Sequence, residues 1–260
     1  MKSDQGGNVR LSEKVAIVTG SASGIGRGIA LKFAEQGAKV VANDLSFMAA
    51  ESVSEKIKDL GGEAIPVQAD VASIEEIGKM FDEVMATFGK VDILVSNAGV
   101  RNDSPIHTLT EAQWDEVINV QLKGCFNCVK LAQKYMVQQR YGKIVIIASP
   151  IPPGLGRPGH SNYSAANAGL IGLTTSLAIE LGGYNINVNC IAPDFIETQM
   201  TRENIRSEGM FLDDFRKAAL ALIPLRRLGT VEDVSNAAVF LASDESSYIA
   251  GQVIKVKGGP

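Results

Sequence analysis

The chain has 260 residues, 45% of them hydrophobic, and a formal net charge of −4 at pH 7. This composition suits one large domain with a deep core, and it excludes a general electrostatic attraction to nucleic acid or to anionic membranes. No apolar run is as long as a membrane span, and residues 1–10 lack the apolar segment of a signal peptide. We therefore expect a cytoplasmic protein with a flexible tail over residues 1–10 and a single domain over residues 11–260.

Apolar runs of strand length alternate with amphipathic helical patterns along the whole chain. Ser73 and Thr110 are typical of helix starts, and Gly37 and Gly89 are typical of helix ends. Strict alternation predicts an α/β fold, in which a doubly wound parallel sheet of about seven strands carries helices on both faces. The expected strands span residues 14–19, 38–43, 63–68, 91–95, 143–148, 186–192 and 252–256, and the expected helices span 24–36, 47–60, 73–88, 110–138, 162–182 and 230–242.

The first expected strand runs into a turn with three glycines, Gly20, Gly24 and Gly26, and a helix follows directly. Glycine allows the positive φ angles of a tight turn and lets an anion approach the backbone. The start of the helix adds unpaired N–H groups and the positive end of the helix dipole. The turn therefore predicts a pyrophosphate site for a dinucleotide, although glycines also serve ordinary loops.

Asp44 ends the second expected strand, about 20 residues beyond the glycine-rich turn, where a carboxylate binds the hydroxyls of an adenosine ribose. Its charge would repel a 2′-phosphate, and residues 21–23 contain no Arg or Lys to offset it. The sequence therefore favours NAD over NADP.

Two segments interrupt the alternation, and both follow the carboxyl ends of strands, where open α/β sheets bind ligands. Residues 149–162 are rich in Pro and Gly, and residues 194–228 lie between a strand and a helix. The second segment is either a mobile substrate lid with an apolar inner face or a surface helix pair that covers core, and both interpretations stay open. Its apolar residues are Met200, Met210, Phe211 and Phe215.

Cys125 and Cys128 form a C-x-x-C pair inside an expected helix. A redox pair would lie at a helix N-terminus, and a zinc site would need two further ligands. We therefore expect both thiols to be packed in the core, and we expect no metal site.

Further motifs follow the glycine-rich turn in a fixed order along the chain. Together with that turn they are Thr19–Gly26, Asp70-Val71, Asn97-Ala98-Gly99, Ser149, Tyr163, Val188–Pro193 and Thr198. These motifs resemble the short-chain dehydrogenase/reductase family over residues 11–260, and they are most similar to its 3-oxoacyl reductase and secondary alcohol dehydrogenase branch. The resemblance implies a single-domain Rossmann fold, NAD as cofactor, a small-molecule substrate and a homo- or hetero-tetramer built through the helices at 110–138 and 162–182.

The resemblance also implies a role for each matching residue. Tyr163 exchanges a proton with the substrate oxygen while the cofactor exchanges hydride with the substrate, and Ser149 orients that oxygen. The implied cofactor contacts are Gly20, Ser21, Ser23, Gly24, Ile25, Gly26, Asp44, Asp70, Val71, Asn97, Ala98, Gly99, Tyr163, Pro193, Ile196 and Thr198.

Two positions depart from the family pattern, and both concern the proton chemistry. The family has Tyr-x-x-x-Lys, whereas here Asn167 follows Tyr163 at the fourth position. Residues i and i+4 share a helix face, so the lysine would stand beside the tyrosine. A cation about 4 Å away, at an effective dielectric near 20, favours a tyrosinate by ~4 kcal/mol. Asn167 is able to hydrogen-bond the cofactor ribose but carries no charge, and a loop arginine, Arg101 or Arg157, is the remaining source of a cation.

The second departure is Gln121, which occupies a helix position where the family has Asn. The amide is kept, but one further methylene would displace a proton-relay water.

Two hypotheses on the function follow from the sequence. The chain is an NAD-dependent oxidoreductase that interconverts a secondary alcohol and a ketone, for example a 3-hydroxyacyl and a 3-oxoacyl thioester. Alternatively, it is a catalytically silent NAD-binding subunit of a hetero-oligomer.

Overall fold

The computed structural model describes residues 9–150, 158–199, 201–202 and 211–259. The strands are β1 (Val15–Thr19), β2 (Lys39–Asp44), β3 (Ala64–Gln68), β4 (Ile93–Ser96), β5 (Gly142–Ile147), β6 (Ile186–Pro193) and β7 (Val253–Val256). They form one parallel sheet in the order β3-β2-β1-β4-β5-β6-β7. Every strand lies within two residues of its expected position, so the predicted doubly wound sheet is confirmed.

The centre of the sheet fixes the place of a ligand site. β1 and β4 are buried along their whole length, as their continuous apolar sequences require for parallel strands covered on both faces. The chain winds outward from β1 to β3 and then returns to place β4 against the other side of β1. The carboxyl ends of β1 and β4 therefore form the switch point at which open α/β sheets bind ligands.

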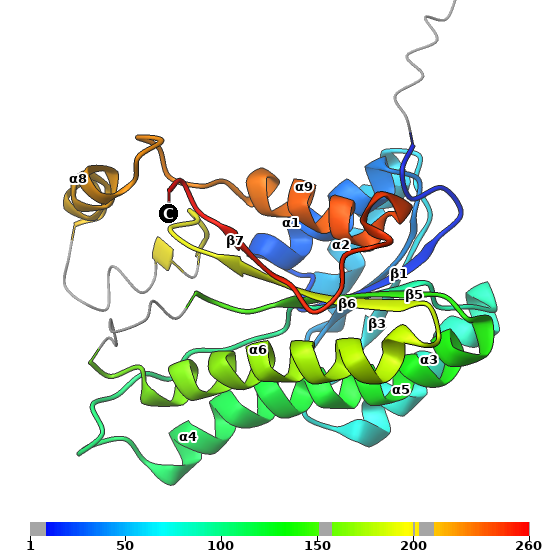
Figure 1. Ribbon diagram of the computed structural model, residues 1–260, viewed down its shortest axis with the longest axis horizontal. Helices are drawn as coiled ribbons and strands as arrows, with labels where there is room; N and C mark the ends of the chain where they lie inside the picture. The colour runs from blue at the N-terminus through cyan, green and yellow to red at the C-terminus, as the bar shows by residue number, and fades with distance from the viewer. Residues whose placement is uncertain (1–8, 151–157, 200, 203–210, 260) are drawn as a thin grey trace, which may run out of the picture.

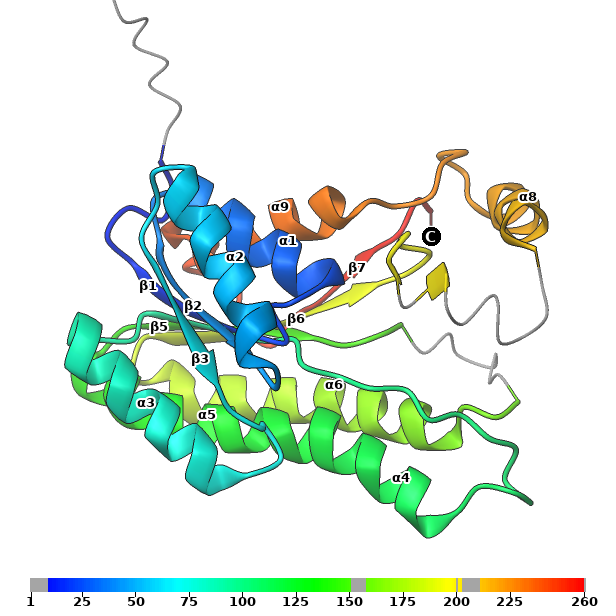
Figure 2. The ribbon, with the colours of Figure 1, turned by 180° about the vertical axis from the view of Figure 1, so that it is seen from behind.

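Helices cover both faces of the sheet, as Figures 1 and 2 show. One layer contains α1, α2 and α9, with α1 packed against α9, and the other contains α3, α5 and α6. Each layer encloses its own apolar core, the first around Phe33 and the second around Phe81 and Met136. The α-helices are α1 (Gly24–Glu35), α2 (Phe47–Asp59), α3 (Ile74–Phe88), α4 (Glu111–Val117), α5 (Gly124–Gln139), α6 (Ser161–Gly182), α8 (Leu212–Leu222) and α9 (Val231–Ala242).

The prediction of one continuous α-helix over residues 110–138 is wrong, because the helical stretch is not α-helical throughout. Between α4 and α5 the chain forms a π-helical segment, η1 (Ile118–Lys123). A π turn carries more residues than an α turn, so hydrophobic spacing alone does not reveal it. Gly124 directly after η1 is packed against the Val71 side chain, where a Cβ would come within 2.7 Å of Cγ2. The Gln121 side chain in η1 is buried.

The segment after β6 contains the helix α8, which stands apart from the two helical layers near the C-terminus (Figure 1). The Phe215 ring of α8 lies 6.3 Å from that of Phe195, and Ala219 is buried. Arg216 of α8 forms an ion pair with Glu197. Of the apolar residues named for this segment, Phe215 makes this ring contact, Phe211 is 78% exposed, and Met200 and Met210 lie outside the described residues.

Residues 1–8 of the expected tail also lie outside the described part of the chain. Arg10, which we assigned to that tail, instead binds both carboxylate oxygens of Glu245. None of the described helices is long and apolar enough to cross a membrane. Cys125 and Cys128 are buried, as expected, and among the described residues no group of three or more His, Cys, Asp or Glu forms a metal site. Burial raises the pKa of the Cys125 thiol to about 11.

Candidate active site

The glycine-rich turn requires glycine at each of its three positions. Gly20 and Gly24 have φ angles of +63° and +53°, in the left-handed region. A Cβ on Gly20 would lie 2.9 Å from the Cα of Ala98, and one on Gly26 would overlap the carbonyl oxygen of Gly20. Asn97 fixes the turn, because its Nδ2 donates to the carbonyl oxygens of Thr19 at 2.9 Å and of Gly20 at 3.0 Å.

The N-terminus of α1 is left open for an anion. Ser23 at its N-cap makes no side-chain capping hydrogen bond, and the first turn contains no acidic residue. α3, α4 and α9 instead begin with side-chain caps and acidic first turns, whereas α2 and α6 share the open start of α1 but do not follow the glycine-rich turn. The unsatisfied N–H groups of α1 and its positive dipole end therefore fit the pyrophosphate of a dinucleotide.

Two carboxylates stand at the ends of neighbouring strands beside this turn. The Asp44 carboxylate accepts hydrogen bonds from the N–H of Ala22 at 3.0 Å and of Ser46 at 3.3 Å, so it lies against the glycine-rich turn. Asp70 accepts in the same way from the N–H of Ala72 at 2.9 Å. The next residue, Val71, is buried, and its carbonyl accepts from Asn127. These positions suit an adenosine moiety lying across β2 and β3.

The segment after β6 approaches the turn from the other side. Thr198 lies next to Gly24, at 3.8 Å from the point where a Cβ would stand. The Ile196 side chain is buried against Gly229, and its carbonyl oxygen accepts a hydrogen bond from Thr201 Oγ1. A groove of about 610 Å³ lies between the start of α1 and the segment after β6. It is lined by Gly24, Arg27, Gly28, Glu197, Thr198, Gln199, Arg202 and Val231.

Tyr163 lies in the first turn of α6 and is connected to the centre of the sheet through two amides. Asn167 is buried, and its Nδ2 donates to the Tyr163 carbonyl oxygen at 2.8 Å and to Gln121 Oε1 at 3.4 Å. Gln121 Nε2 donates in turn to the carbonyl oxygen of Val100 at 3.0 Å. Gln121 and Asn167 thus bind each other and the backbone on either side of the site. Ser149 follows β5, and the loop at 151–157 beyond it lies outside the described residues.

A charged cluster that the sequence did not identify as a unit surrounds Tyr163. The guanidinium carbon of Arg101 lies 5.2 Å from the centroid of the Tyr163 ring. Arg101 forms an ion pair with Asp103 and a 2.7 Å hydrogen bond to His160 Nε2. The His160 ring faces the Tyr163 ring edge-on at 6.4 Å. Arg101 was one of two loop arginines considered as a cation source, and the other, Arg157, lies outside the described residues.

Comparison with known proteins identifies the family of the chain. A family model described as "Enoyl-(Acyl carrier protein) reductase" matches residues 20–260. The 3-oxoacyl-[acyl-carrier-protein] reductase FabG of Thermotoga maritima is 43% identical over 252 residues, covering 96% of this chain and 99% of that protein. The chain belongs to the short-chain dehydrogenase/reductase family. It is therefore an oxidoreductase that acts between a secondary alcohol and a ketone and uses a nicotinamide cofactor.

Other relatives place it in the same family. The (2S)-[(R)-hydroxy(phenyl)methyl]succinyl-CoA dehydrogenase subunit BbsD of Thauera aromatica is 40% identical over 249 residues, with 96% of this chain and 97% of that one covered. A putative gluconate dehydrogenase of Agrobacterium tumefaciens superposes with a TM-score of 0.90 at 33% identity, over 96% of each chain. A 7α-hydroxysteroid dehydrogenase complexed with NADH gives 0.89 at 34% identity, over 97% of this chain and 96% of that one. These relatives do not favour the silent-subunit hypothesis.

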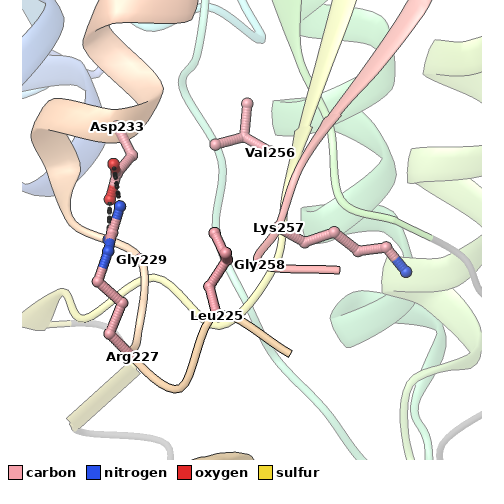
Figure 3. A pocket seen from close by; sticks show the side chains of 7 residues that line it. All are labelled: Leu225, Arg227, Gly229, Asp233, Val256, Lys257 and Gly258. Carbon is pink, nitrogen blue, oxygen red and sulfur yellow. Dashed lines mark hydrogen bonds and ion pairs between the residues drawn. The ribbon is translucent and has the colours of Figure 1, made fainter. Parts of the chain in front are cut away.

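A separate small cavity of this short-chain dehydrogenase/reductase lies between the loop that precedes α9, the start of α9 and the end of β7. It has a volume of about 110 Å³ and is drawn in Figure 3. Arg227 binds both carboxylate oxygens of Asp233, while Lys257 points to the opposite side. Asp233 also caps α9 through Thr230, and the Arg227 guanidinium holds the pKa of its carboxyl well below the usual range. These contacts of Asp233 with Arg227 and Thr230 stabilise the N-terminus of α9.

Proposed function

We propose that the protein is a cytoplasmic, NAD-dependent oxidoreductase that interconverts a secondary alcohol and a ketone on an acyl thioester, with Tyr163 as its acid–base group. The observation that carries this proposal is the position of Tyr163. Its helical turn is bound through Asn167 and Gln121 to Val100, directly after the Asn97–Gly99 segment at the switch point of the sheet. The names of the Thermotoga and Thauera relatives support an acyl-carrying substrate.

The preference for NAD rests on Asp44. Its carboxylate is held against the glycine-rich turn by the Ala22 N–H, so a 2′-phosphate would lie beside a fixed negative charge. A ribose with a free 2′-hydroxyl instead donates to that carboxylate. The remaining proposed cofactor contacts are Gly20, Ser21, Ser23, Gly24, Ile25, Gly26, Asp70, Val71, Asn97, Ala98, Gly99, Tyr163, Pro193, Ile196 and Thr198.

Different side chains carry the proton transfer and the orientation of the substrate. The nicotinamide, when bound, supplies or accepts the hydride. Tyr163 donates its phenolic proton to the substrate oxygen during reduction and takes it back during oxidation, and Ser149 hydrogen-bonds that oxygen and orients it. Asn167 and Gln121 are neutral and are bound to each other, so they position the helical turn without adding charge. A neutral phenol still serves as an acid, and we therefore expect carbonyl reduction to be the less impaired direction.

The test uses purified protein with NADH and a panel of ketones and 3-oxoacyl thioesters. We expect turnover by the parent chain, and a loss of about 10²–10⁴-fold in Tyr163→Phe, which is the usual contribution of a positioned acid. NADH affinity is expected to stay within a few-fold of the parent value in that variant. Tyr184→Phe, at a half-exposed position outside the site, is the matched control. Tight NADH binding without turnover of any substrate would instead support the silent subunit.

We also propose that copies of the chain associate through α5 and α6. Phe126 on α5 is 49% exposed and Ile179 on α6 is 80% exposed, although both are apolar. A Cβ on Gly172 of α6 would meet nothing within 4 Å, so this helix leaves room for a close neighbour. Light scattering of the parent chain and of Ile179→Asp tests the proposal. A tetramer that persists in Ile179→Asp would contradict it.

A further inference from the structure

The absence of lysine at position 167 leaves the Tyr163 phenol without the cation that its family places one helical turn away. Asn167 cannot act in its place, because its Nδ2 is committed to the Tyr163 carbonyl oxygen and to Gln121. In the described part of the chain, the cation found over the Tyr163 ring is Arg101. Its guanidinium carbon is 5.2 Å from the ring centroid, within the range of about 6 Å at which cation–π attraction operates.

Arg101 is held in this place by two side chains from different parts of the sequence. Asp103, two residues further along the loop that follows β4, forms an ion pair with it. His160, directly before α6, lies 2.7 Å from its Nη2. Arginine only donates hydrogen bonds, so His160 Nε2 is the acceptor of this one, and the same nitrogen lies 3.5 Å from a carboxylate oxygen of Asp103. The side chain of Arg101 is 16% exposed, and its Nε is buried without a partner.

The Nη2 end of the Arg101 guanidinium makes the contacts to Asp103 and His160, while its buried Nε has no partner, which is unfavourable for a buried N–H. The charged and titratable groups near the Tyr163 ring include Arg101, Asp103 and His160. From the side of α4, Glu116 accepts a hydrogen bond from Asn102. Asp103 weakens the field of Arg101 but does not remove it, because the guanidinium itself faces the ring.

We propose that Arg101 is a positioning residue that supplies, from the loop after β4, the positive charge that the family supplies from lysine on α6. The attraction of a guanidinium to a phenol ring grows when the ring becomes a phenolate, so Arg101 favours the proton-donating step of Tyr163 in reduction and its deprotonated form in oxidation. This inference rests on the proposed acid–base role of Tyr163.

The experiment compares Arg101→Gln, Arg101→Lys and the double variant Arg101→Gln/Asn167→Lys. The first readout is the formation of tyrosinate in the cofactor-free protein, followed by NMR of ring-carbon-labelled tyrosine, with the Tyr163 signal assigned by its loss in Tyr163→Phe. The second readout is the pH profile of alcohol oxidation. Arg10→Gln, which removes an arginine from a surface ion pair with Glu245, is the control.

We expect tyrosinate formation to move to higher pH in Arg101→Gln. Because the cation that favours the phenolate is removed, oxidation near neutral pH is expected to fall severalfold. Arg101→Lys is expected to keep most of the parent behaviour. In the double variant, the lysine at position 167 is expected to restore both readouts, which loss of a merely structural contact would not allow.

A titration in Arg101→Gln that coincides with that of the parent would overturn the inference, as would failure of Asn167→Lys to restore a shifted titration. If Arg101→Gln does not fold, Arg101→Met removes the charge at similar length and is expected to give the same shift. The two proposals can be refuted separately. If the Tyr163 titration shifts in Arg101→Gln but the parent turns over no ketone, the role of Arg101 is retained and the proposed function is refuted. If the parent is active but the titration does not shift, the proposed function is retained and the role of Arg101 is refuted.

Discussion

Replacement of Asp44 by asparagine tests the predicted cofactor preference most directly. The substitution keeps the size of the side chain and removes its charge. One of its two backbone hydrogen bonds, from Ala22 or Ser46, is lost as well, because an amide offers a single acceptor oxygen. We expect that loss to lower the free energy of unfolding by about 1 kcal/mol, which leaves the fold intact.

The effect on binding follows from the charge. A phosphate charge about 6 Å from the carboxylate, at an effective dielectric near 20, is repelled by roughly 3 kcal/mol. Asp44 is half-buried at the rim of the site, so solvent and salt reduce this value, and we expect NADPH affinity to rise about tenfold in Asp44→Asn. NADH affinity is expected to fall about tenfold, because a charge-assisted hydrogen bond to the ribose becomes a neutral one.

Calorimetric titration of both cofactors into the parent and the variant measures these changes. Asp70→Asn is the matched control, since Asp70 lies two residues beyond β3 and also accepts from a nearby N–H group. It is expected to weaken both cofactors to a similar degree, without changing the preference. An Asp44→Asn protein that still prefers NADH as strongly as the parent would refute the electrostatic reasoning.

Three further predictions follow from the site and its supports. Gly26→Ala is expected to abolish NADH binding and lower Tm, because its methyl group overlaps the Gly20 carbonyl oxygen, and a thermal shift assay with and without NADH checks both. Asp233→Asn is expected to lose about 1 kcal/mol of stability at neutral pH, because it removes the charge that pairs with Arg227 and weakens the hydrogen bonds that Thr230 donates to this side chain. Because the folded pKa of Asp233 is depressed, this contribution is present above the ordinary Asp pKa and is lost as pH falls through the folded value, so parent and variant should converge in acid denaturation. The Cys125 thiol, whose pKa burial raises to about 11, should react with a thiol reagent only as the protein unfolds, and rapid labelling of folded protein would contradict its burial.

The sequence predicted the sheet well because burial on both faces demands long apolar runs, and such runs are visible without any structure. β1 and the glycines that follow it are specified locally, by sterics that act within a few residues. The same holds for the α3 and α4 starts at Ser73 and Thr110, whose side chains bind N–H groups three residues ahead.

What the sequence did not reveal depends on contacts between distant segments. The π-helical segment η1 lies inside a stretch whose apolar spacing is compatible with a continuous α-helix, and packing of Gly124 on Val71 accompanies the change. Arg101 and His160 are separated by 59 positions in the chain. Spacing carries no information about which of several loop arginines reaches a given tyrosine, so only the geometry distinguishes Arg101.

The unprotected first turn of α1 has a consequence for the lifetime of the protein. A helix that begins without a side-chain cap or an acidic residue leaves part of its stabilisation to be provided by a bound anion. Dinucleotide at a hundred times its dissociation constant adds about 2.7 kcal/mol to the native state, which lowers the unfolded fraction roughly a hundredfold. Resistance of the protein to proteolysis should therefore increase with the concentration of the dinucleotide. When the dinucleotide is scarce, the unfolded fraction rises, and the protein is degraded faster.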